Sequence, residues 1–143
     1  MIILRNNLFS KKEHKASLKD HDSYRGIGRS YFLGGLPGIV GTYVGKEHGL
    51  NLEKEGYTDK EIEEKAGGRG ALVGAATGAV VSPIVAASLA KQLPEVSKSK
   101  LATSALLGMT ALGALGSYLG AKKNISDRVE KRDRFERLMN KYK

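Results

Sequence analysis

Two long stretches of the chain carry no charged residue, and a short polar segment separates them. The first covers Ala71–Ala90 and the second covers Leu101–Ala121. Lys91–Lys100 lies between them, and Pro94 marks a turn there. A helix needs about 20 apolar residues to cross a bilayer, and each stretch reaches that length. The pattern therefore predicts a helical hairpin with two apolar arms.

A small residue recurs at every fourth position of the first arm, which places one smooth stripe along a helix that is apolar all round. Such a helix must be buried, either in lipid or inside a protein assembly. Small residues let two helix backbones approach closely in bilayers, within one hairpin or between protomers. The second arm has one clear pair at the same spacing. The predicted helix-packing residues are Gly70, Gly74, Gly78, Ser82, Ala86, Gly116 and Gly120.

Three further elements are expected around this hairpin, so the predicted fold class is all-α. Residues 30–45 form a shorter apolar segment, kinked near Pro37, that is too short for a full crossing. Residues 58–66 form a short polar helix with a capping box of Thr58 and Glu61, which ends near a glycine pair. Residues 122–143 form a basic amphipathic helix. The predicted division is a basic arm (1–29), a glycine-rich helical domain (30–121) and the basic helix (122–143).

The chain has 143 residues and a formal net charge of +9, concentrated at its two ends. Basic ends suit lipid head groups, nucleic acid or another anionic surface, and they also keep an apolar middle soluble. If only the two arms cross a membrane, both basic ends lie on the same side, as the positive-inside tendency prefers. The predicted contacts with an anionic partner are Lys122, Lys123, Arg128, Lys131, Arg132, Arg134 and Arg137.

The sequence offers little catalytic chemistry, and we expect no enzyme, no cofactor and no metal. The chain has no cysteine, which excludes disulfides and thiol chemistry. Its three histidines lie in polar stretches without an arranged nucleophile or acid partner. His14 and His21 lie near Asp20 and Asp22, but in a lysine-rich arm that is not typical of a metal site. Residues 41–46 have neither the spacing nor the preceding strand of a phosphate-binding loop.

The segments GGRGALVGAATGAVV and LLGMTALGALGSYLG, with their short charged flanks, resemble the glycine-zipper proteins found among internal virion and ejection proteins of tailed bacteriophages. The resemblance covers about half of the chain, is compositional, and transfers no functional residue. It implies a protein that is stored in a capsid or tail and later enters the host envelope, where it helps DNA to cross.

Two alternatives remain open beside a membrane-inserting structural protein that associates through Gly70, Gly74 and Gly78. In the first, the chain is a subunit of a virion or another large complex, and its hairpin packs in a protein-walled groove. In the second, it is a small subunit of an organellar inner membrane, which the basic, acid-free first twelve residues favour. The expected partners are other copies or other subunits, membrane lipid, and nucleic acid or an anionic surface at the basic ends.

Overall fold

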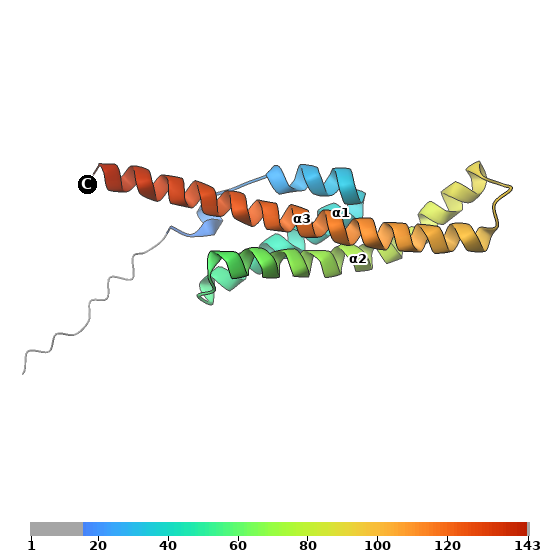
Figure 1. Cartoon of the computed structure of the whole chain (residues 1–143), viewed down its shortest axis with the longest axis horizontal. Coiled ribbons are helices and arrows are strands. Elements are labelled where there is room, and N and C mark those ends of the chain that lie inside the picture. Colours follow the sequence, from blue (N-terminus) through green and yellow to red (C-terminus); the bar gives the residue numbers. More distant parts are fainter. Residues whose placement is uncertain (1–15, 143) are drawn as a thin grey trace, which may run out of the picture.

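The structure, a computed structural model, describes residues 16–142, and every regular element in that range is helical. A short 3₁₀ turn, η1 (Leu18–Asp20), precedes the helices α1 (Arg25–Lys54), α2 (Asp59–Gln92) and α3 (Lys98–Lys141). In Figure 1, α3 runs along the length of the molecule, and α1 and α2 lie beside it. The all-α fold predicted from the sequence is confirmed.

The two apolar arms lie in α2 and α3, which run in opposite directions and are joined by residues 93–97 (Figure 1). α2 ends at a C-cap, Leu93, whose backbone N–H donates to the Leu89 carbonyl. Pro94 follows directly, where it cannot continue the helix. The helical hairpin is therefore present at the predicted place.

Both flanking helices expected from the sequence are continuous with the arms of the hairpin, which corrects their predicted ends. The capping box of Thr58 and Glu61 does begin α2, but this helix passes through the glycine pair and ends only at Gln92. Gly67 lies against the ring of Tyr118, and Ala66 is fully buried. Close packing here outweighs the poor helix propensity of glycine, about 1 kcal/mol per residue. The basic C-terminal segment likewise continues α3 rather than forming a separate helix.

α1 is longer than the predicted segment 30–45, and it reverses direction at Gly35. This residue has φ 55° and ψ −140°, a conformation that only glycine adopts readily. The first limb (residues 25–34) and the second limb (residues 36–54) then run side by side, with Gly38 against the carbonyl of Ser30 (Figure 1). Pro37 lies in the first turn of the second limb, where its missing N–H costs nothing. The predicted kink is thus a full reversal.

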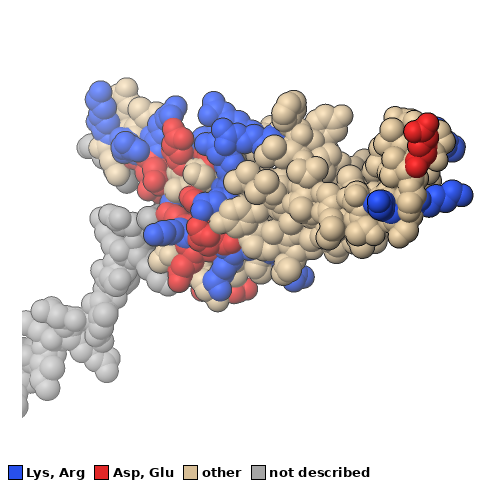
Figure 2. Space-filling model, turned by 45° about the vertical axis from the view of Figure 1, so that its right-hand side comes forward, with Lys and Arg blue, Asp and Glu red and all other residues tan. Residues whose placement is uncertain are grey.

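The molecule has two regions of different character, which Figure 2 shows as a charged end and a surface almost free of charge. The base comprises residues 16–29, 46–70 and 122–142. The apolar half comprises residues 30–45, 71–90 and 101–121. Beyond it, the far turn (residues 91–100) brings a few charges to the other tip. In the described part of the chain, the cluster of buried hydrophobic residues lies in the base: Leu18, Leu50, Leu52, Ile62, Ala66 and Ile125.

Candidate functional site: an apolar helical hairpin on a charged base

Glycine and serine form the contact between α2 and α3 in the apolar half. A Cβ atom on Gly74 would overlap Ser117 Oγ and the carbonyl of Gly113, and one on Gly78 would overlap the carbonyl of Met109. A Cβ on Gly70 would lie 2.9 Å from the carbonyl oxygen of Gly41 in α1. The helices therefore approach so closely that no side chain fits between them.

The predicted packing residues are buried or half-buried, but they do not all face the same helix. Gly70, Gly74, Gly78 and Ser82 are buried, and Ala86 is half-buried. Gly116 and Gly120 are buried too, but they face α1 instead of α2: Gly116 meets the first limb, and Gly120 meets both Thr42 of the second limb and Ser30 of the first. Because this single chain covers the small-residue stripe of α2, the same glycines are closed to a second copy in this fold. The association of copies through Gly70, Gly74 and Gly78 that the sequence predicts would therefore lack an exposed surface.

Sequence reasoning missed the glycines of α1 as packing residues. Gly41, Gly45 and Gly49 lie on the second limb at four-residue spacing. A Cβ on Gly45 would lie 2.7 Å from the Cβ of Ala121, and one on Gly49 would lie 2.9 Å from the Cδ1 of Ile125. The signal that could have identified them is the same four-residue spacing that marks α2, which here continues past the predicted end of the segment at residue 45.

Ser117 ties the second limb of α1 to the centre of the bundle. Its buried Oγ donates to the carbonyl oxygens of Pro37 and Gly38, at 3.2 Å each. Ser30 Oγ donates to the carbonyl of Ile27 at 2.8 Å, within the first limb. Both hydroxyl groups donate hydrogen bonds to backbone carbonyls, as polar side chains in an apolar setting must.

Many large side chains of the apolar half point outward. Phe32 is 90% exposed, Val80 is 77% exposed and Ile84 is 72% exposed. α2 and α3 each contain an 18-residue stretch long and apolar enough to cross a membrane, and only 17% and 33% of these stretches are buried within the chain. A water-soluble domain buries such residues at about 25 cal/mol per Å². Here the small residues are inside and the large ones outside.

In the base, two of the predicted anion-contact residues are buried and paired inside the chain. Arg128 and Arg132 are each 2% exposed. Arg128 donates to Asn124 Oδ1 at 2.9 Å and to the carbonyl of Leu18 at 3.1 Å, and it forms an ion pair with Asp22. Arg132 donates to both carboxylate oxygens of Asp59, at 3.1 and 2.6 Å. These two arginines are therefore not available to an external anion.

The other five predicted cations lie on the surface of α3 with partners in the chain. Lys122 pairs with Glu64, Lys123 with Asp127, and Arg134 with Glu130. Lys131 and Arg137 donate to backbone carbonyls. Carboxylates therefore accompany the cations of α3, which weakens the case for a nucleic-acid surface along this helix.

Ion pairing at the base shifts the titration of its exposed carboxyl groups. The hydrogen bond from Tyr24, with the charge of Arg128, holds the pKa of Asp22 below its ordinary value. Hydrogen bonds from Lys122 and Tyr118 lower the pKa of Glu64. The hydrogen bond to Glu64 raises the pKa of Lys122. The charged forms of these groups are therefore the ones that the fold favours.

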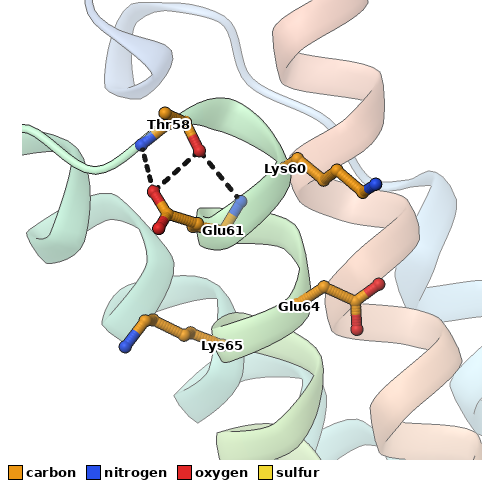
Figure 3. A pocket seen from close by; sticks show the side chains of 5 residues that line it. All are labelled: Thr58, Lys60, Glu61, Glu64 and Lys65. Carbon is orange, nitrogen blue, oxygen red and sulfur yellow. Dashed lines mark hydrogen bonds between the residues drawn. The ribbon is translucent and has the colours of Figure 1, made fainter.

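An open hollow lies at the start of α2, lined by Thr58, Lys60, Glu61, Glu64 and Lys65 (Figure 3). Thr58 N and Oγ1 donate to Glu61 Oε2 at 3.0 and 2.7 Å, and Glu61 N donates to Thr58 Oγ1 at 3.4 Å. These bonds complete the capping box, and the hydrogen bond from Thr58 lowers the pKa of Glu61. The hollow is thus lined by groups that the helix start already uses.

The described residues show no arrangement suited to holding a metal ion. Within residues 16–142, no group of three or more His, Asp or Glu side chains converges in the way that a metal site requires. The ring of His21 packs at 5.8 Å from the ring of Phe135. His14, the other histidine of that arm, lies outside the described residues.

Comparisons of this chain with protein-family models, with curated proteins and with solved structures find no match. Its function must therefore be argued from its own residues.

Proposed function

We propose that this chain is a non-enzymatic structural protein of a membrane, in which α2 and α3 cross the bilayer as a hairpin. The observation that carries this proposal is the outward placement of large apolar side chains in the apolar half. Leu72, Val80 and Ile84 on α2 are all more than two-thirds exposed, and Leu107 on α3 is 66% exposed. Lipid is the medium in which such an exterior is stable, because acyl chains are as apolar as these side chains.

The dimensions of the hairpin match a bilayer. Residues 71–90 and 101–121 rise about 30 Å at 1.5 Å per residue, which is the thickness of the hydrocarbon core. Neither stretch contains a charged residue. Within this stretch of α2, Thr77 Oγ1 donates to the carbonyl of Val73 and Ser82 Oγ donates to the carbonyl of Ala79, at 2.8 Å each. These two hydroxyls and the helical backbone therefore need no water at this depth.

Tyrosine and lysine side chains meet where the apolar half joins the base. Lys46 Nζ lies 5.1 Å from the centre of the Tyr43 ring, and Lys122 Nζ lies 5.7 Å from that of Tyr118. Tyrosine is enriched at membrane–water interfaces, where its ring meets acyl chains and its hydroxyl meets water. These pairs support a membrane border at the level of Tyr118 and Lys122.

Charge favours one orientation of the proposed hairpin. The far turn contains three lysines and one glutamate, whereas the base contains the remaining described Lys and Arg residues. Under the positive-inside tendency, the base and both termini lie on the cytoplasmic side, and the far turn lies on the opposite side. Storage in a phage virion before host entry stays a prediction of the resemblance.

A second candidate function is a subunit of a larger protein assembly, favoured by an exposed face near the end of α3. Phe135, Leu138, Met139 and Tyr142 recur at helical spacing and are each about half exposed or more. At 1.5 Å per residue, Phe135 lies about 20 Å along α3 from the end of the apolar stretch, beyond the reach of acyl chains. This face predicts a protein partner outside the bilayer.

Flotation of the full chain with liposomes tests the proposed function. Without detergent, the chain should rise with the vesicles, and trypsin should cleave the base while Lys91 and Lys98 in the far turn stay protected. Val80→Arg combined with Ile84→Arg should abolish flotation, because each arginine costs about 2.5 to 3.5 kcal/mol near the bilayer centre.

The matched control is Asn51→Arg combined with Glu55→Arg, which adds two arginines at exposed positions of the base. This variant should float like the unchanged chain. A chain that stays at the bottom of the gradient would overturn the proposal and favour the assembly subunit.

A further inference from the structure

The two limbs of α1 accompany α3 along only part of its apolar stretch. On the first limb, Gly26 lies against Gly120, and Gly34 lies against Gly113 and Gly116. The second limb returns in the other direction, with Gly41 against Ser117. Past this point, α3 continues beyond the reversal of α1 with α2 beside it (Figure 1). The reversal at Gly35 marks the deepest point that α1 reaches.

The outer side of this reversal is apolar and exposed. Tyr31, Phe32 and Leu36 are 65%, 90% and 66% exposed, and Leu33 is 37% exposed. These side chains surround the point where α1 turns, inside the apolar half of the molecule. No carboxylate, lysine or arginine lies between Ser30 and Gly45. Their surroundings must therefore be apolar as well.

The position of the reversal along α3 sets its depth in the proposed membrane. From Gly26 to Gly34 the first limb rises about 12 Å, close to half of a hydrocarbon core of about 30 Å. Gly26 lies near the border marked by Tyr118 and Lys122, because it contacts Gly120. The reversal would then lie near the middle of the bilayer.

We infer that the protein is a wedge that prefers curved membranes, a proposal that rests on the proposed membrane insertion. Four helical segments cross the leaflet next to the base: both limbs of α1, α2 and α3. Only α2 and α3 cross the other leaflet. The greater cross-section on the side of the base favours a bilayer that is convex on that side, and the acyl chains of that leaflet cover Phe32 and Leu36.

Close contacts hold the limbs of α1 in this position. A Cβ on Gly34 would lie 2.7 Å from the carbonyl oxygen of Leu112. Ser117 Oγ donates to the carbonyls of Pro37 and Gly38 on the other limb. The limbs are thus fixed to α3, so the wide end of the wedge is part of the fold.

Vesicles of two sizes test this inference. The full chain is added to preformed small and large vesicles of the same phosphatidylcholine–phosphatidylglycerol mixture, and the protein bound per lipid is measured after flotation. Insertion from outside leaves the base on the convex surface, which trypsin cleavage of the base verifies. Because wedge-like insertion is sensitive to curvature, we expect about threefold more protein per lipid on the small vesicles.

Phe32→Ser combined with Leu36→Ser should remove the preference for small vesicles while the chain still floats, because the reversal no longer favours the acyl region. Leu115→Ser combined with Leu119→Ser is the matched control: it also replaces two exposed apolar residues, but on α3 instead of α1, and should keep the preference. Circular dichroism checks that both variants stay helical.

A depth measurement separates lipid from another occupant. Since the chain has no cysteine, Phe32→Cys provides a unique site for a fluorescent label. Lipids brominated near the ends of their acyl chains should quench this label more strongly than lipids brominated near the head group.

The outcomes of these experiments distinguish the wedge, membrane insertion itself and the position of the reversal. Equal binding to both vesicle sizes overturns the wedge while membrane insertion stands, and failure to float with either size overturns the proposed function itself. A label that shallow lipids quench best, or that crosslinks to a second copy, overturns the placement of the reversal in the acyl chains.

Discussion

The base and the apolar half of this chain are stabilised in opposite ways. In the base, Leu18, Ile62 and Ile125 are fully buried, as in a water-soluble domain, and buried arginines are paired with carboxylates. In the apolar half, glycine and serine lie inside, and many large side chains, such as those of Phe32, Val80 and Leu107, are exposed. One continuous helix, α3, passes through both regions. The same backbone is therefore packed for water at one end and for an apolar medium at the other.

The largest effect should come from adding one methyl group inside the apolar half. Gly74→Ala places a Cβ onto Ser117 Oγ and the carbonyl of Gly113, so α2 and α3 must separate. We expect the free energy of unfolding in detergent to fall by about 3 kcal/mol, the upper range for overpacking. Thermal unfolding followed by circular dichroism measures it.

Gly108→Ala is the matched control, because no atom lies within 4 Å of a Cβ at that position. It should leave stability unchanged or raise it by up to about 1 kcal/mol, since alanine favours a helix more than glycine does. Equal losses in the two variants would show that close helix contact does not stabilise the apolar half.

A smaller effect is expected from breaking a charged contact in the base. Asp59→Asn removes the carboxylate that accepts two hydrogen bonds from Arg132. The arginine is 2% exposed, so its charge is left poorly compensated. Asp133 remains beside it, and Asp59 itself is 33% exposed. We therefore expect a loss of about 2 kcal/mol, below the range for a fully buried pair.

Arg134→Gln provides the comparison for this variant, because Arg134 and Glu130 are both exposed. Its loss should stay below about 0.5 kcal/mol, as is usual for surface pairs at helical spacing. Chemical unfolding measures the free energy of unfolding of both variants. Equal values would mean that the contact between Arg132 and Asp59 stabilises the fold no more than a surface ion pair does.

The smallest effect should come from acid, and it should be confined to the base. The pKa values of Asp22, Glu61 and Glu64 are lowered in the folded chain, so their stabilisation is present above their ordinary values of 3.8, 4.5 and 4.5. That stabilisation is lost as the pH falls below these values. Burial raises the pKa of Glu63, which acts in the opposite direction.

Hydrogen exchange measured from pH 6 down to about pH 3, corrected for the intrinsic exchange rate, reports on this difference. Amides of the base should lose protection first, whereas those of residues 71–90 and 101–121, which contain no acidic or basic side chain, should not change. Loss of protection at the same pH in both regions would contradict the proposed division.

Much of this architecture could be predicted because it depends on local pattern. About twenty consecutive residues or fewer specify each of three features: an uncharged arm, the turn at Pro94, and the capping box of Thr58 and Glu61. The ends of α2 and α3 could not be predicted in the same way. Gly67 and Gly68 are typical of a helix end, and only the packing of Ala66 and Gly67 against their neighbours carries α2 past them.

In the candidate site too, local spacing predicts some features and contacts between distant residues decide the others. Four-residue spacing identified Gly70, Gly74 and Gly78 as packing residues, because periodicity fixes which residues share a helix face. Periodicity does not say which helix that face meets. The reversal of α1 at Gly35 brings Gly34 to Gly116, and no local signal specifies a contact between residues so far apart. No local signal specifies the burial of Arg128 and Arg132 either, since composition alone predicts that both are free cations.

The sequence by itself determined that the chain is helical, that two arms are long and uncharged, and that small residues form one face of the first arm. These properties follow from the order of residue types along one helix. Only the tertiary structure decided that α1 folds back beside α3, that the glycine faces are closed within one chain, and that two arginines are buried. Those outcomes depend on which surfaces of distant segments fit together, since close packing is a property of pairs of helices and not of either alone.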